Sequence, residues 1–232
     1  MYNPKDLVTA PPRSHRNALS NTRIYIMATP SSKKTLMTLY SGNDCVFAHR
    51  VRFVLEEKAM EYQTIDVDLA NKPEDLAELN PYNQVPTLVD RDLAIHESVL
   101  IMEYLDERFP HPPLIPVDPI SRAKVRLGLL RFDRDWFAPL FQPGYSAEQI
   151  KTAKEQIRST LAGLSSIFSQ QRYLFGDELS VLDCAIAPLL WRLPVLEISL
   201  PAAARATQEY MDRVFTLESF KRCLTPAEKA MR

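Results

Sequence analysis

The chain has 232 residues with a formal net charge of −1, and 46% of its residues are hydrophobic and 25% charged. This length accommodates two small packed domains, and the composition is that of an ordinary globular protein. The near-zero net charge argues against a nucleic-acid-binding face, and no apolar run approaches the ~20 residues of a membrane-spanning helix. Three widely spaced cysteines, Cys45, Cys184 and Cys223, show no metal-ligand pairing, so we expect reducing, cytoplasmic surroundings and no metal site.

Residues 1–33 are polar, contain prolines and show no hydrophobic periodicity. The apolar stretch Ile24-Tyr25-Ile26 is too short for the core of a secretory signal. We predict a disordered extension here, or a start codon assigned too early, with Met27 as the true beginning.

Residues 36–67 have the pattern of strand, helix and strand. An apolar run at 36–40 precedes the turn Ser41-Gly42-Asn43-Asp44, and Ile65 and Val67 mark the second strand. Between them, apolar residues recur at helical spacing on one face: Phe47, Val51, Val54 and Leu55. The opposite face is polar and carries His49, Arg50 and Arg52. Because a helix connects the two strands, we expect them to be parallel.

Residues 80–98 combine a proline bend, a hairpin and a helix start. Val85 precedes a proline and is therefore extended, and Pro86 belongs at a strand start because it cannot donate to a sheet. A cis peptide bond before Pro86 would leave the Val85 amide and carbonyl free to pair with a peptide-like ligand. Glu97 and Ser98 open the next helix, whose free amides would suit a carboxylate, although Ser98 would serve equally as a helix cap.

These elements predict an α+β protein with two domains. A short helix starting at Pro73 and a helix over 97–108 complete a thioredoxin-like βαβαββα domain at residues 34–112. A proline-rich linker at 113–119 and an all-helical domain at 120–232 follow. Within the helical domain, Ser180 and Asp183 have the spacing of a capping box. The apolar run after it, residues 184–193, predicts a buried core helix.

Two sets of segments carry a family resemblance. Gln84-Val85-Pro86-Thr87-Leu88, followed by Glu97-Ser98, resembles the glutathione-binding half of the glutathione transferase superfamily. Residues 102–114 and 188–194 resemble the stringent starvation protein A family, a bacterial branch that associates with RNA polymerase and is not known for transferase chemistry. The resemblance covers the chain from about residue 36 to its C-terminus. It implies the glutathione transferase fold, a homodimer, and a glutathione-like cleft formed by Val85, Pro86, Glu97 and Ser98.

Two residues are candidates for catalysis. Cys45 lies at a helix N-terminus, where the dipole lowers a thiol pKa, but no proline follows it as in thiol-type transferases. Ser41 lies near the position of a serine that binds the glutathione thiol in some transferase classes. The plainer interpretation, which we favour, is an incidental cysteine and a loop serine. Glutathione is then a possible ligand and not a required cofactor.

The resemblance also implies a partner surface. It matches Pro110, His111, Pro112 and Tyr104 to the patch through which stringent starvation protein A contacts RNA polymerase. A stiff proline-rich segment loses little entropy on docking, which suits such a role. We therefore expect a starvation regulator that binds RNA polymerase holoenzyme, through its sigma factor, without catalysis. The alternative is a glutathione S-transferase or thiol transferase that uses Cys45 or Ser41.

Overall fold

The elements of the first half follow the order expected from the sequence. The computed structural model describes residues 36–232, so the extension expected at 1–33 lies outside the described residues. The half comprises β1 (Met37–Ser41), α1 (Val46–Glu57), β2 (Tyr62–Asp66), α2 (Glu74–Leu79), β3 (Thr87–Asp90), β4 (Leu93–His96) and α3 (Ser98–Arg108). The predicted βαβαββα order is therefore confirmed, as is the hairpin between β3 and β4.

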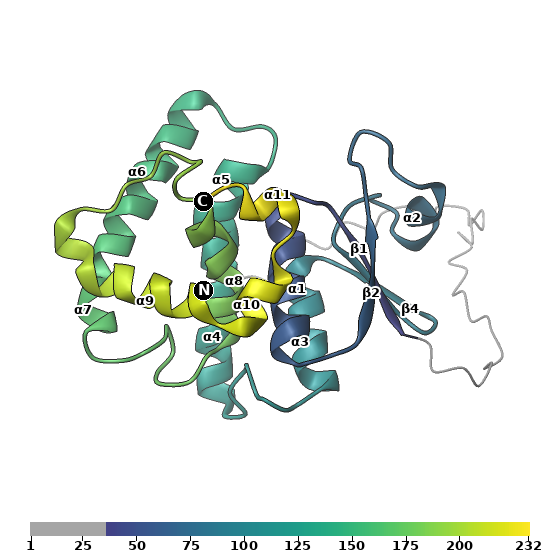
Figure 1. Cartoon of the computed structure of the whole chain (residues 1–232), viewed down its shortest axis with the longest axis horizontal. Helices are drawn as coiled ribbons and strands as arrows, with labels where there is room; N and C mark the ends of the chain where they lie inside the picture. Colours follow the sequence, from purple (N-terminus) through teal and green to yellow (C-terminus); the bar gives the residue numbers. More distant parts are fainter. Residues whose placement is uncertain (1–35) are drawn as a thin grey trace, which may run out of the picture. The chain divides into compact units, whose positions relative to one another are not determined.

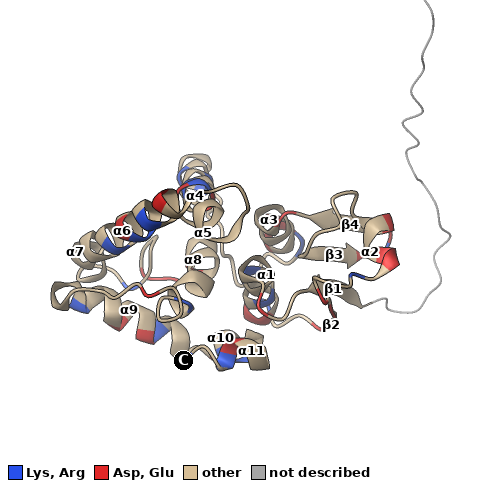
Figure 2. Cartoon of the chain, turned by 90° about the horizontal axis from the view of Figure 1, so that it is seen from above, with Lys and Arg blue, Asp and Glu red and all other residues tan. Residues whose placement is uncertain are grey.

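These strands form one four-stranded sheet in the order β2-β1-β3-β4. β1 and β2 are parallel, as the helical connection requires, whereas β3 pairs antiparallel with both neighbours. Helices α1 and α3 cover one face of the sheet and α2 covers the other (Figure 2). Leu39 of β1 is paired with Leu88 of β3, and both side chains are fully buried. On the α2 face, Tyr40 and Val67 pack with Leu76.

The second half is helical. It comprises α4 (Pro119–Phe132), a π-helix η1 (Asp133–Phe137), α5 (Ala138–Phe141), α6 (Ala147–Gly163), α7 (Ser165–Phe168), α8 (Val181–Trp191), a 3₁₀ turn η2 (Ala202–Ala204), α9 (Arg205–Thr216), α10 (Glu218–Cys223) and α11 (Pro226–Lys229). The helix expected over 147–170 is divided between α6 and α7, with the break after Gly163. The final helix, expected from residue 217 to the end, is likewise divided between α10 and α11.

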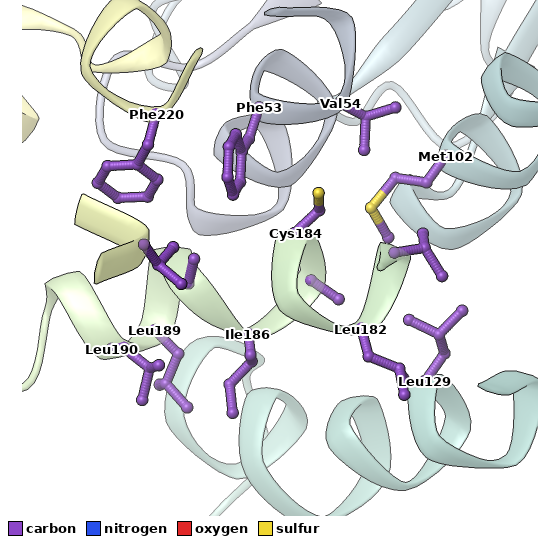
Figure 3. Packing of buried hydrophobic residues seen from close by; sticks show 14 of the residues in the cluster. Phe53, Val54, Met102, Leu129, Leu182, Cys184, Ile186, Leu189, Leu190 and Phe220 are labelled. Atoms are coloured by element: carbon purple, nitrogen blue, oxygen red, sulfur yellow. The ribbon is translucent and has the colours of Figure 1, made fainter. Parts of the chain in front are cut away.

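Helix α8 is the centre of the core, as its apolar sequence predicts (Figure 1). The predicted capping box is present, since the Ser180 amide donates to Asp183 Oδ2 at 2.8 Å and Ser180 Oγ donates to the same atom at 2.7 Å. Figure 3 shows Cys184 on the side of α8 that faces Phe53 and Val54 of α1, while Leu182 lies beside Leu129 of α4. One hydrophobic cluster therefore runs through both halves of residues 36–232.

The polar face of α1 is buried, which the sequence pattern does not predict. The exposed fractions of His49, Arg50 and Arg52 are 0%, 0% and 4%. The expectation of a helix with one buried and one polar exposed face is wrong because α8 and α10 pack against the face that the sheet leaves uncovered. Buried charges require partners, and these partners lie in the distant segments described below. None of the helices within 36–232 combines the length and apolar character that crossing a bilayer would require.

Candidate functional site

A cleft of about 460 Å³ lies between the loop that precedes β3 and the segment at the end of α5. Four of its lining residues are those predicted for a glutathione-like cleft, Val85, Pro86, Glu97 and Ser98, and Cys45 also lines it. Further lining residues come from α1, the loop between β2 and α2, the loop before β3, the end of β4, the end of α5 and the segment after it: Phe47, Leu69, Lys72, Gln84, His96, Phe141, Gln142 and Pro143. The fold thus brings together side chains that are separated by up to 98 positions in sequence.

The loop before β3 is shaped by Asn80, a residue that the sequence analysis did not single out. The Val85–Pro86 peptide bond is cis, as expected. Asn80 is fully buried and its Nδ2 donates to the Gln84 carbonyl at 3.1 Å and to Thr87 Oγ1 at 3.0 Å. Lys72 Nζ donates to the Asn83 carbonyl at 2.8 Å. Several hydrogen bonds therefore hold the loop against the sheet.

Glu97 turns the chain from β4 into α3. Its φ is +70°, a value that non-glycine residues rarely adopt and that costs free energy. Glu97 is the N-cap residue and makes no capping hydrogen bond with its side chain, so the expectation that Ser98 caps the helix is wrong. Ser98 is the first helical residue, is 5% exposed and accepts a hydrogen bond from Arg50 Nη1 at 3.3 Å. The start of α3 therefore borders the cleft through Glu97 and Ser98, at a turn with a strained backbone.

Arg50 lies behind this end of the cleft and connects four elements. Its Nη1 is 2.6 Å from Asp133 Oδ1 of the π-helix, and its Nε donates to the Ala185 carbonyl of α8 at 2.9 Å. The guanidinium also lies 3.6 Å from the centroid of the Phe137 ring. Burial lowers the pKa of Arg50 and the Asp133 carboxylate opposes that effect. Arg50, which the sequence pattern places on the polar face of a helix, is thus buried and links α1 to α3, η1 and α8.

Of the two catalytic candidates, only Cys45 lies in the cleft. It is the N-cap residue of α1, with its Sγ 3.9 Å from the Val85 carbonyl oxygen. Burial raises its thiol pKa, and this outweighs the lowering by the backbone amides of Ala48 and Phe47. The expected activation by the helix N-terminus is therefore overcome by burial, and the protonated thiol is favoured.

Ser41 is placed away from the cleft. It is 1% exposed, is not among the lining residues and accepts a hydrogen bond from Arg52 Nη1. Its hydroxyl donates weakly to the Gly42 carbonyl at 3.4 Å. Both hydrogen-bonding functions of the side chain are used within the fold. Within residues 36–232 there is also no group of three or more His, Cys, Asp or Glu side chains arranged for a metal ion.

The predicted partner patch is exposed and well anchored. Pro110, His111 and Pro112 are exposed, while Tyr104 is half-buried and donates to Asp90 Oδ2 at 2.6 Å. Beneath the patch, the Lys58 ammonium donates to Asp106 Oδ1 at 2.6 Å and to the Pro112 carbonyl.

Asp106 is the residue that fixes the chain after the patch, and the sequence analysis missed it. Its carboxylate accepts hydrogen bonds from the amides of Leu114, at 2.8 Å, and Ile115, at 3.1 Å. Both Lys58 and Asp106 are buried, at 5% and 7% exposed. A buried ion pair and two backbone amides therefore hold the linker in one conformation on the surface.

Comparisons with known proteins agree with this arrangement. Residues 44–108 match the model of the glutathione S-transferase N-terminal domain, and residues 142–213 match that of the C-terminal domain. A stringent starvation protein A homolog from Haemophilus influenzae is 48% identical over 196 residues, which cover 84% of this chain and 92% of the relative. The chain belongs to the stringent starvation protein A family. The predicted membership and fold class are therefore confirmed.

Other members and more distant relatives support the same placement. The stringent starvation protein A homolog from Coxiella burnetii is 43% identical, over 86% of this chain and 97% of that protein. Rat glutathione S-transferase omega-2 is 32% identical, over 69% of this chain and 66% of its own length. Among solved structures, glutathione transferase Omega 3C from Trametes versicolor has a TM-score of 0.71 at 27% identity, covering 83% of this chain and 85% of that one.

Proposed function

We propose that this member of the stringent starvation protein A family is a cytoplasmic transcription regulator. In this proposal it binds RNA polymerase holoenzyme by contact with the sigma factor, alters promoter use under starvation, and performs no catalysis. The observation that carries the proposal is the exposed segment Pro110-His111-Pro112, anchored by the buried Lys58–Asp106 pair. A surface already held in one conformation loses little entropy when a partner docks.

The environments of the two candidate catalytic residues support the same proposal. Transferase chemistry needs a nucleophile or a hydrogen-bond donor poised beside the bound thiol. Burial raises the pKa of the Cys45 thiol, and Ser41 lies outside the cleft with its hydroxyl already engaged. Neither candidate is therefore prepared for that task.

Glutathione transfer is the second candidate function. It is favoured by the placement of Cys45 in the cleft, next to the cis Val85–Pro86 bond, and by the distant relatives named glutathione S-transferase. Under this alternative Val85, Pro86, Glu97 and Ser98 would hold glutathione. The same cleft would also allow glutathione to bind without turnover.

We also propose a homodimer, for which the exposed apolar side chains of α3 and α4 are the support. Leu100, Leu127 and Leu130 are 56%, 60% and 52% exposed. The two helices are joined beside them by Arg126 Nη2 and Glu103 Oε2, which are 2.8 Å apart. Exposed apolar side chains on two neighbouring helices are candidates for a protein interface, and in this proposal a second copy of the chain covers them.

The decisive experiment is co-purification of the tagged protein with RNA polymerase holoenzyme of the source organism. We expect the Pro110→Ala, His111→Ala double variant to lose retention while its circular dichroism spectrum is unchanged. The matched control changes Gln142 and Pro143 to alanine, which are exposed on a different loop, and should retain polymerase. Unchanged retention of the linker variant would overturn the interface. Conjugation of glutathione to a general electrophile that is lost in Cys45→Ala would instead favour the enzyme.

A further inference from the structure

The C-terminal helix α11 contacts the loop that carries Cys45 into the cleft. Thr225 Oγ1 donates to the Asn43 carbonyl, and Arg192 Nη2 donates to the Asp44 carbonyl at 3.0 Å. These two carbonyls belong to the turn between β1 and α1, immediately before Cys45. Figure 1 shows α11 next to α1. The end of the chain and the turn that leads into Cys45 are therefore in direct contact, although Thr225 and Asn43 are 182 positions apart.

Glu228 is the centre of this contact. Its side chain is fully buried and its carboxylate accepts hydrogen bonds from Arg192 Nη2 at 2.6 Å and Arg52 Nη2 at 2.7 Å. His49 Nδ1 lies 3.1 Å from Oε1 of the same carboxylate. We refer to Arg52, Arg192, His49 and Glu228 as the Glu228 cluster. The backbone carbonyl of Glu228 also accepts from Trp191 Nε1 at 2.8 Å, so both ends of the residue are held.

The charges of the cluster are satisfied only when α11 is in place. Burial lowers the pKa of His49 to about 4, so the ring is neutral at pH 7. Its Nδ1 lies 3.1 Å from Glu228 Oε1 and 3.0 Å from Arg192 Nη1, and Arg192 Nη1 also donates to the Pro188 carbonyl at 2.9 Å. Arg52 and Arg192 then have Glu228 as their shared acidic partner, since no other acidic group of the described chain pairs with either. Withdrawing α11 would leave two buried guanidinium groups without a counter-charge, which is costly.

The guanidinium groups also connect the cluster to the turn. Arg52 Nη1 donates to Ser41 Oγ at the end of β1, and Arg192 reaches Asp44 with the same Nη2 that binds Glu228. Glu228 therefore orients both arginines toward residues 41–44 from one side. A change in this carboxylate alters the position of both donors, and with them the turn that ends at Cys45.

We propose that Glu228 is a positioning residue for the cleft, which acts through Arg52 and Arg192 to hold the turn before Cys45. In this proposal the C-terminal residues 225–228 do not line the cleft, but they support the turn that carries Cys45 into it. The proposal does not rest on RNA polymerase binding or on glutathione transfer. It predicts that any change that loosens α11 opens the Cys45 end of the cleft and leaves the Pro86 end in place.

Hydrogen–deuterium exchange of the full-length protein, followed by mass spectrometry, tests this directly. In Glu228→Gln we expect at least about tenfold faster exchange of amides in residues 42–49, because the two buried guanidinium groups that hold the turn lose their counter-charge. Peptides covering β3 and β4 should exchange at the wild-type rate. Glu218→Gln changes an exposed glutamate of α10 that pairs with Lys221, and it serves as the matched control with no expected effect.

The outcomes separate a positioning role from a merely structural one. Faster exchange confined to residues 218–232, or equal acceleration over the whole chain, would overturn the proposal. If Glu228→Gln does not fold, Thr225→Val removes the hydrogen bond to Asn43 without changing a charge and should produce the same local effect. Wild-type exchange of residues 42–49 in a folded Thr225→Val variant would then refute it.

Discussion

The stability of this protein is expected to fall between pH 7 and pH 5 because of one buried histidine. His49 is fully buried, and burial lowers its pKa from 6.5 to about 4. The unfolded chain therefore binds a proton below pH 6.5 that the folded chain does not accept until about pH 4. Because protons then favour the unfolded chain, the free energy of unfolding is highest above pH 6.5 and decreases as the pH falls toward 4. The full effect is about 3 kcal/mol, and about 2 kcal/mol of it falls between pH 7 and pH 5.

The assay is urea-induced unfolding at pH 7 and pH 5, compared between wild type and His49→Gln. The glutamine side chain can still donate to Glu228 but does not titrate, so the difference between the two pH values should shrink by about 2 kcal/mol. His111→Gln removes an exposed histidine and is the matched control. Both pH values lie above the ordinary glutamate pKa of 4.5, so protonation of Glu228 contributes little to the difference in stability. An undiminished pH dependence in His49→Gln would refute the reasoning.

Two further predictions concern the core helix and the cleft. Asp183→Ala should lower the free energy of unfolding by about 4 kcal/mol in urea titrations, because it leaves the amides of Leu174 and Ser180 and the Tyr210 hydroxyl without their buried acceptor. Asp212→Ala, on the exposed side of α9, should have little effect, and equal losses would contradict this assignment. Cys45 should react with an uncharged maleimide more slowly at pH 7 than free glutathione does, because burial raises its pKa. Labelling of Cys45→Ala gives the baseline, and wild-type labelling as fast as that of glutathione would exclude a protonated, half-buried thiol at Cys45.

Protonation of Glu228 at low pH should lower the stability of the folded protein, as protonation linked to His49 does. Burial by itself would raise the pKa of Glu228, but the hydrogen bond with His49 and the charges of Arg52 and Arg192 outweigh it and lower the pKa. A carboxylate with a lowered pKa contributes stability above its ordinary value, and that contribution is lost as the pH falls. Protonation at low pH would therefore weaken the hold on the turn before Cys45.

The sequence by itself determined the local elements and the family. Hydrophobic spacing placed the helix that contains Val51 and Val54, the cysteine-bearing apolar run placed α8, and Ser180 with Asp183 placed its start. Proline chemistry located the bend at Pro86, because a residue without an amide hydrogen restricts its neighbours whatever the rest of the chain does. These features depend on residues that are close in sequence, which is why they can be read without a structure.

Only the tertiary structure decided which charges are buried and what they connect. His49, Arg50 and Arg52 have the spacing of a polar helix face, and nothing local indicates that α8, α10 and α11 cover that face. Their partners, Asp133 and Glu228, are 83 and 176 positions away in the pairs with Arg50 and Arg52. The same reason explains the fate of Ser41 and the pKa of Cys45. Burial is a property of the packed molecule, and it outweighs the effect of the helix N-terminus that the sequence alone reveals.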